Sequence, residues 1–172
     1  MMRVVAFLLG IVAALLVAAG GSYLVIRSGL IPANADADPG SFEKWAARTS
    51  LRATIAREMP QGDAQIPASP ENLRAGMKLY GENCAFCHGL ADGKATNSAL
   101  GLFQKPPQLA KHPVGKDQAG SIYWKIAHGI RFTGMPAYAP NLSGTQLWQL
   151  TVFLQQMDKL PAPLDAEWTA LR

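Results

Sequence analysis

The stretch that decides the fold reads Cys84-Ala85-Phe86-Cys87-His88. A Cys-x-x-Cys-His run is the pattern at which a c-type haem is attached. Two thiols must each bond to one vinyl group of a porphyrin, while an imidazole approaches the iron from one face of the ring. Residues three and four apart are neighbours on a helix, so Cys84, Cys87 and His88 can hold one flat molecule together. The run therefore predicts a covalent haem c.

Two other uses of a Cys-x-x-Cys pair must be weighed, because the chain contains only two cysteines. A structural zinc site normally has four Cys or His ligands, and the sequence has no second pair. A thioredoxin-like redox pair would lie near a βαβ pattern, and none is visible. The histidine directly after the pair favours haem attachment over both alternatives.

The composition argues against several classes of function. The 172 residues include 16 Lys and Arg against 12 Asp and Glu, which gives a formal net charge of +4. These basic residues are spread along the chain, whereas a nucleic-acid-binding protein concentrates them, so no nucleic acid is expected as a partner. The mild excess fits docking to a protein with an acidic patch. No nucleophile–base pair or metal cluster that would support a hydrolase is visible, and the chain is not expected to be an enzyme.

An uncharged and almost wholly apolar segment runs from Val4 to Ile26. As a helix it would span about 34 Å, enough to cross a bilayer. A cleaved signal peptide is the alternative, since residues 33–37 resemble cleavage sites, but the apolar core of a signal is usually shorter. We expect residues 1–30 to be an uncleaved, single-pass transmembrane signal-anchor. Covalent haem attachment takes place outside the cytoplasm, so the haem domain is expected on the periplasmic side of the inner (cytoplasmic) membrane.

Residues 31–68 are expected to form a linker with one amphipathic juxtamembrane helix. Ser41 can cap a helix that runs from Phe42 to about Glu58. Basic residues repeat every four positions along it, and three apolar residues accompany them. These positions are Lys44, Arg48 and Arg52 for the charges, and Trp45, Leu51 and Ile55 for the apolar side chains. The helix either lies on the membrane surface, with its cations toward anionic headgroups, or packs on the haem domain or a partner subunit.

The haem domain is expected over residues 69–162, followed by a C-terminal tail over 163–172. The run 69–71, Ser-Pro-Glu, is typical of a helix start, and this helix should lead into the haem run and end at Gly89. A capping box at 143–146 begins the last helix. The apolar run from Leu147 to Leu160 continues this last helix.

Gly76, Tyr80 and Cys84 follow each other at steps of four on the first of these helices. A glycine inside a helix costs about 1 kcal/mol relative to alanine, and a close crossing by another helix would offset that cost. Leu150 and Phe153 on the last helix form the apolar patch that suits this crossing. No stretch shows a convincing strand pattern, so the domain is expected to be all-α.

The motifs follow each other in the order seen in class I cytochromes c, which this sequence resembles from about Glu71 to Leu160. They are the Cys84–His88 run, the Gly76 and Tyr80 stripe, Pro107-x-Leu109, Gly134-Met135-Pro136 and Leu150-x-x-Phe153. With its apolar N-terminal segment, the whole chain resembles a membrane-anchored monohaem cytochrome c of bacteria. The resemblance implies an all-α cytochrome c fold, with an N-terminal transmembrane helix and a juxtamembrane helix, that holds one covalent haem c.

The resemblance also implies roles for individual residues. Cys84 and Cys87 would form the thioethers, His88 would be the proximal iron ligand, and Met135 would be the distal ligand. The Pro107 carbonyl would accept a hydrogen bond from the other ring nitrogen of His88 and so fix its tautomer.

Five further residues bear on the haem site. Leu109 would pack on the haem face, while Trp124 and Arg131 would line the haem edge or meet a propionate. His112 and His128 are the alternative iron ligands, although neither lies in a recognisable ligand loop.

An iron with both axial positions filled is suited to one-electron transfer. The resemblance therefore implies a carrier of single electrons between a donor and an acceptor at the membrane or in the periplasm. The alternative is a fixed haem subunit of a larger oxidoreductase or oxidase complex, with the helix from 42 to 58 as its docking element. A haem enzyme or gas sensor is the third possibility, and it would need an open iron site.

Overall fold

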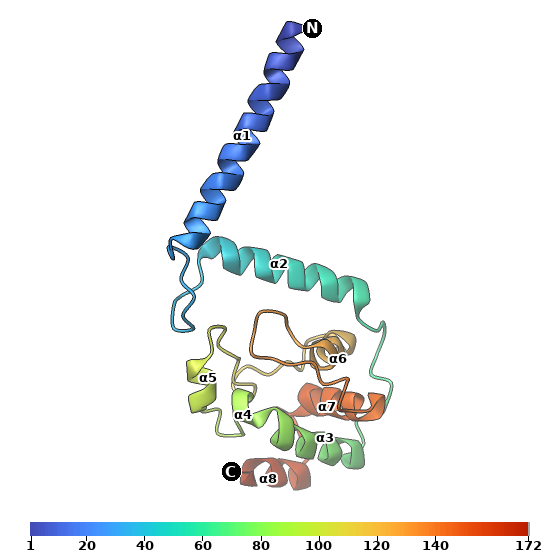
Figure 1. The fold of residues 1–172 in the computed structure, drawn as a ribbon. Helices are drawn as coiled ribbons and strands as arrows, with labels where there is room; N and C mark the ends of the chain where they lie inside the picture. Colours follow the sequence, from blue (N-terminus) through green and yellow to red (C-terminus); the bar gives the residue numbers. More distant parts are fainter. Residues whose placement is uncertain (172) are drawn as a thin grey trace. The chain divides into compact units, whose positions relative to one another are not determined.

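The computed structural model describes residues 1–171, which form eight helices and contain no strand. Figure 1 shows their course along the chain. The all-α class predicted from the sequence is thus confirmed for the described residues. The helices are α1 (Met2–Arg27), α2 (Ser41–Glu58), α3 (Pro70–Asn83), α4 (Ala85–His88), α5 (Asn97–Gly101), α6 (Ala119–His128), α7 (Gly144–Gln156) and α8 (Ala162–Ala170).

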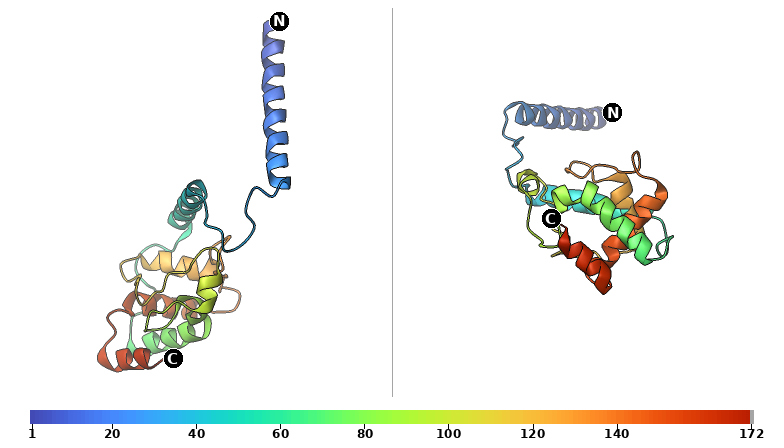
Figure 2. Two further views of the ribbon diagram at one scale, coloured as in Figure 1. Left: turned by 90° about the vertical axis from the view of Figure 1, so that its left-hand side faces the viewer. Right: turned by 90° about the horizontal axis from the view of Figure 1, so that it is seen from below.

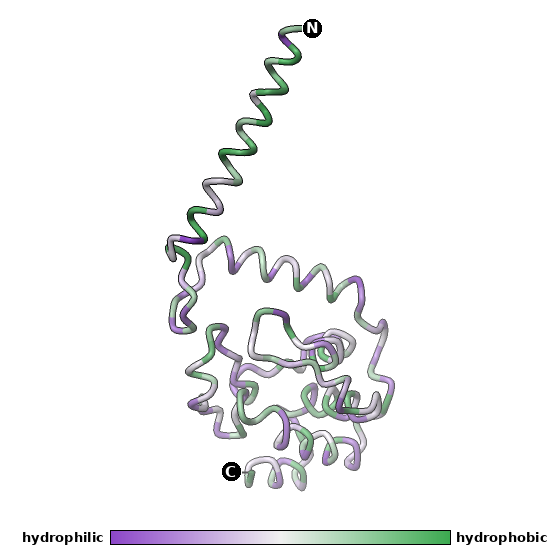
Figure 3. The backbone as a smooth tube through the Cα atoms, viewed as in Figure 1, coloured by the Kyte–Doolittle hydropathy of each residue, from purple (hydrophilic) through white to green (hydrophobic). Residues whose placement is uncertain are grey.

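Helix α1 belongs to a unit of its own, because the chain divides into two compact units, one ending at Ala37 and the next beginning at Asp38. None of the α1 side chains is buried. Figure 3 shows that hydrophobic residues follow one another along most of this helix. Among the described residues, α1 alone is long and apolar enough to cross a membrane.

Helices α3 and α7 form the centre of the second unit and cross where α3 carries Gly76. A Cβ atom at Gly76 would lie 2.1 Å from the backbone oxygen of Gln149 and 2.7 Å from the Cβ of Phe153. Only glycine permits this approach. One turn further along α3, the ring of Tyr80 packs on Phe153 with centroids 5.6 Å apart. The crossing predicted from the step-of-four pattern is therefore confirmed.

Helices α3 and α7 begin with the caps that the sequence predicts. The Ser69 hydroxyl accepts a hydrogen bond from the backbone N–H of Asn72 at the start of α3. At the start of α7, Ser143 and Gln146 form a reciprocal capping box. Because each cap satisfies backbone groups that would otherwise lack a partner, the two helices start at defined points and keep their register at the crossing.

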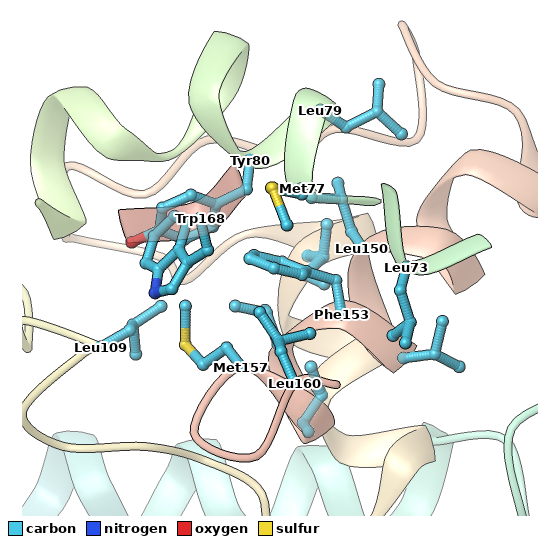
Figure 4. Close-up of a cluster of buried hydrophobic side chains, with 14 of the residues drawn as sticks. Leu73, Met77, Leu79, Tyr80, Leu109, Leu150, Phe153, Met157, Leu160 and Trp168 are labelled. Atoms are coloured by element: carbon cyan, nitrogen blue, oxygen red, sulfur yellow. The ribbon is translucent and has the colours of Figure 1, made fainter. Parts of the chain in front are cut away.

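The chain does not end in the tail that we expected over residues 163–172. Helix α8 packs on the core instead, and Arg172 lies outside the described residues. The indole of Trp168 meets Tyr80 and Phe153 edge-on, with centroid distances of 5.4 Å to each. Figure 4 shows Trp168 beside Tyr80 in the buried cluster. Leu164, one turn before Trp168, is also fully buried, so the step of four gives α8 its core-facing side.

Helix α2 packs on the haem domain through α6, which is one of the two alternatives left open for it. Ile55 is buried, and the indole N–H of Trp124 donates to a Glu58 carboxylate oxygen at 3.3 Å. A Cβ at Gly120 would lie 1.9 Å from the backbone oxygen of Pro60, so the segment after α2 also lies directly on α6. The linker expected over 31–68 is therefore part of the packed unit from α2 onward.

Candidate haem site

A cavity of about 390 Å³ opens between the haem run and the loop that carries Met135. Its walls come from the ends of α3 and α4, the loops before and after α6, α6 itself, and single residues of α2 and α7. Most of the side chains that line it are apolar. The predicted site residues on its walls are Cys84, Cys87, His88, Pro107, Leu109 and Met135.

The haem run occupies a tight turn at the end of α3. Cys84 ends α3 and precedes the single-turn helix α4, and its carbonyl accepts the backbone N–H of His88 at 2.9 Å. Gly89 ends α4 in a positive-φ conformation at 73°, which glycine adopts without strain. The buried Tyr80 hydroxyl donates to the Gly89 carbonyl at 2.8 Å. Tyr80, whose ring packs on α7, thus also holds this turn in place through its hydroxyl group.

His88 is held with one ring nitrogen bound and the other free. Its Nδ1 lies 2.8 Å from the Pro107 carbonyl oxygen, and since a carbonyl only accepts, Nδ1 carries the proton. Burial lowers the pKa of His88, while the bond to Pro107 opposes this in part. The imidazole is therefore neutral, and its Nε2 lone pair is available to a metal.

Met135 lies on a loop that its own backbone contacts shape. Its N–H donates to the Thr133 hydroxyl at 3.1 Å, and its carbonyl accepts the N–H of Ile130 at 3.2 Å. A Cβ at Gly129 would lie 2.6 Å from that carbonyl, and one at Gly134 would lie 2.7 Å from the Leu102 side chain. Two glycines thus allow the loop to close against its surroundings and hold Met135 on the cavity wall.

The ionisation of Cys84 argues against a thiol–disulfide function. Burial, together with the nearby Cys87, raises the pKa of Cys84 to about 12. A cysteine that attacks disulfides needs a lowered pKa, because the thiolate is the nucleophile. A structural zinc site is not supported either, because no three Cys, His, Asp or Glu side chains within residues 1–171 are grouped so that they could bind a metal ion.

Trp124 and Arg131 do not lie on the cavity wall, in contrast to what the resemblance implied. Trp124 is turned toward Glu58 of α2. The Arg131 guanidinium lies over the ring of Phe132, 4.8 Å from its centroid, on the outer surface of the loop. Neither His112 nor His128 lines the cavity. Of the candidate iron ligands, only His88 and Met135 face it within the described residues.

Most residues of the cavity wall were not predicted from the sequence, and three of them bear on the site. Leu51 of α2, Lys125 of α6 and Tyr138 lie on the wall. Tyr138 donates from its hydroxyl to the Asn83 carbonyl at 2.6 Å, which ties the chain after the Met135 loop to the end of α3. Burial, followed by the charges of the two cysteines, raises the pKa of Tyr138 to about 12, so the hydroxyl remains a donor at neutral pH. A tyrosine three positions after Met135 was the one available signal.

The donor set fits a haem c. Two thiols and one imidazole come from a single turn, a thioether sulfur comes from a second segment, and the space between them is apolar. A porphyrin needs this combination of covalent anchors, axial ligands and a water-poor pocket. No other chemistry suggested by the haem run uses all four groups.

Such a fold and cavity define a c-type cytochrome, and the comparisons with known proteins agree. Residues 71–154 match the family described as cytochrome c oxidase, cbb3-type, subunit III. This segment is a cytochrome c domain, similar to those of bacterial c-type cytochromes. A cytochrome c domain implies covalently bound haem c.

Curated relatives carry the same domain within longer chains. The cbb3-type cytochrome c oxidase subunit FixP of Rhizobium meliloti is 29% identical over 93 residues, which are 54% of this chain and 30% of FixP. The subunit FixPc of Rhizobium leguminosarum bv. viciae is 33% identical over 100 residues, 56% of this chain and 31% of FixPc. The matched segment thus spans less than a third of these relatives.

Part of this chain is also similar to solved structures, of which one is named here. It is the Kuenenia stuttgartiensis reducing HAO-like protein complex Kustc0457/Kustc0458, with 27% identity, a TM-score of 0.45, and coverage of 57% of this chain and 50% of that one.

Proposed function

We propose that the chain carries one haem c, which Cys84 and Cys87 hold through thioethers and His88 and Met135 ligate, and that it transfers single electrons between redox proteins at a membrane. The observation that carries this proposal is that all four side chains line one apolar cavity. When bound, the haem iron supplies the one-electron chemistry by cycling between its ferric and ferrous states.

The residues around the cavity suit an electron carrier. His88 and Met135 would hold the iron and raise its reduction potential, and the apolar wall would raise it further, because it disfavours the extra charge of the ferric iron. The Pro107 carbonyl fixes the orientation of His88, and the Thr133 hydroxyl orients the Met135 loop. Such supports limit rearrangement when the electron arrives or leaves.

The covalent and axial assignments can be tested together on the purified chain. We expect the intact mass to exceed that of the polypeptide by one haem. We also expect the ferrous protein to bind carbon monoxide slowly and incompletely, because Met135 blocks the distal position. Rapid and complete binding would instead support a haem enzyme or gas sensor, and a mass increase of zero or of two haems would contradict the single-haem assignment.

We further propose that α1 anchors the chain in the inner membrane, with the haem domain on the periplasmic side. Its length and apolar composition support this, as does the need for covalent haem attachment outside the cytoplasm. A tether keeps the haem domain at a high effective concentration near membrane-bound donors and acceptors. Weak docking then suffices for turnover.

The alternative of a fixed haem subunit is favoured by a specific observation, because the relatives named above are subunits of a cbb3-type oxidase. Purification in mild detergent separates the two possibilities. A shuttle should elute alone, whereas stable co-elution with other redox subunits would show a fixed subunit and contradict the shuttle.

A further inference from the structure

The two sides of the cavity differ in what they can offer a haem. Cys84 and Cys87 line the cavity at its α4 end. Two other helices also contribute to its wall, α2 through Leu51 and α6 through Lys125. Figures 1 and 2 show α2 on one side of the unit and α3 with α4 on the other, with α6 between them. A haem attached at α4 therefore extends toward α2 and α6.

Haem chemistry then fixes which edge reaches these helices. The two vinyl groups that bond to cysteine and the two propionates lie on opposite sides of the porphyrin. If the vinyl side is held at Cys84 and Cys87, the propionates are directed away from α4. Two carboxylates at an otherwise apolar cavity are costly unless cations or hydrogen-bond donors accompany them. The resemblance offered Trp124 and Arg131 for this role, but neither lies on the wall.

Two lysines lie on the cavity wall, Lys105 before α6 and Lys125 on α6. The Lys105 ammonium already donates to the Leu100 carbonyl at 2.6 Å, whereas Lys125 lies on the helix against which α2 packs. The Lys125 side chain is 30% exposed, so it reaches both cavity and solvent. Its Nζ lies 3.1 Å from a carboxylate oxygen of Asp117, and Asp117 is not on the cavity wall. An ammonium group has three donors, so this ion pair leaves two for another acceptor.

Helix α2 supplies a second cation next to the same edge. Leu51 is half-buried and touches the cavity. At 3.6 residues per turn, Lys44 and Arg48 lie about 20° and 60° from Leu51 around the helix axis, and Arg57 lies about 120° away. Arg48 is the nearer of the first two along the axis, within one turn of Leu51. Within the described residues, the Arg48 guanidinium makes no hydrogen bond or ion pair.

The geometry points to α2 as the cover of the propionate edge of the haem, with Arg48 of α2 and Lys125 of α6 as the cationic partners of the two carboxylates. This rests on the proposed haem attachment. Helix α2 would then contribute to haem binding. This explains why the packed unit begins at Asp38, well before the matched segment that starts at residue 71. Arginine suits this role, because its planar guanidinium can bind a carboxylate through two parallel hydrogen bonds.

Two variants of the full-length chain with haem attached, Arg48→Gln and Lys125→Gln, test the proposal. Each should lower the midpoint potential, because a cation near the haem favours the reduced form with its lower positive charge. Each should also shift the propionate bending bands in the resonance Raman spectrum, which respond to hydrogen bonds at the carboxylates. Arg48→Lys should restore much of the potential while leaving the propionate bands altered.

Arg57→Gln is the matched control, because it removes the same charge from another face of α2 and should leave the propionate bands unchanged. If either Arg48→Gln or Lys125→Gln leaves both the potential and these bands unchanged in a chain that carries haem, the proposal is overturned. A wild-type chain without covalent haem would instead overturn the proposed function and this proposal with it, so the two failures can be told apart.

Discussion

Replacing Met135 with alanine should open the distal side of the haem and change the spectrum, the ligand binding and the midpoint potential of the protein together. The near-infrared band that marks a methionine–iron bond should disappear, and the ferrous form should bind carbon monoxide rapidly. The midpoint potential should fall by a sizeable part of the roughly 0.8 V range that axial ligands span. The cause is local, because the Met135 loop is closed by backbone contacts that do not involve the thioether.

Met59→Ala is the control for this experiment. Met59 is another partly buried methionine of the same unit, and it lies outside the cavity. Its removal should leave the near-infrared band and the slow carbon monoxide reaction unchanged. An unaltered band in Met135→Ala would show that another group ligates the iron, and His128, the nearest histidine in sequence, would then be the next residue to replace.

The parts of this protein that could be predicted from sequence are those with local patterns. The Cys84–His88 run, the caps at Ser69 and Ser143 and the step from Gly76 to Tyr80 each depend on residues within one or two helical turns. Such signals have a fixed spacing and therefore a narrow range of structures that satisfy them.

The parts that could not be predicted depend on contacts between distant segments. The pattern of α2 suits a membrane surface as well as a protein surface, and only the contacts of Ile55 and Glu58 with the haem domain decide between them. Helix α8 has only two deeply buried side chains, Leu164 and Trp168, too few for a periodic signal. Trp124 shows the same limit in the site, because its indole N–H finds its partner in a carboxylate 66 positions away.

A large effect on stability is expected from a substitution at the crossing of α3 and α7. Gly76→Ala should lower the free energy of unfolding by about 1–3 kcal/mol or more, the usual cost of overpacking a close-packed core. The added methyl group would lie 2.1 Å from the Gln149 carbonyl oxygen and 2.7 Å from the Phe153 Cβ. Because one contact is with the backbone of α7, no change of side-chain rotamer can relieve it, and the helices must move apart.

Gly81→Ala on the same helix is the matched control, since a Cβ at Gly81 would meet nothing within 4 Å. Only the helix propensity then changes, and the free energy of unfolding of this variant should rise by up to about 1 kcal/mol. Denaturant unfolding of the full-length protein in detergent, followed by Soret absorbance and tryptophan fluorescence, reports on the haem domain rather than on α1, which has no tryptophan. A higher free energy of unfolding in both variants would contradict the close crossing, because helix propensity would then outweigh packing at Gly76. A loss at Gly76 alone would show that this glycine sets the distance between α3 and α7, and with it the position of Tyr80 beneath the haem run.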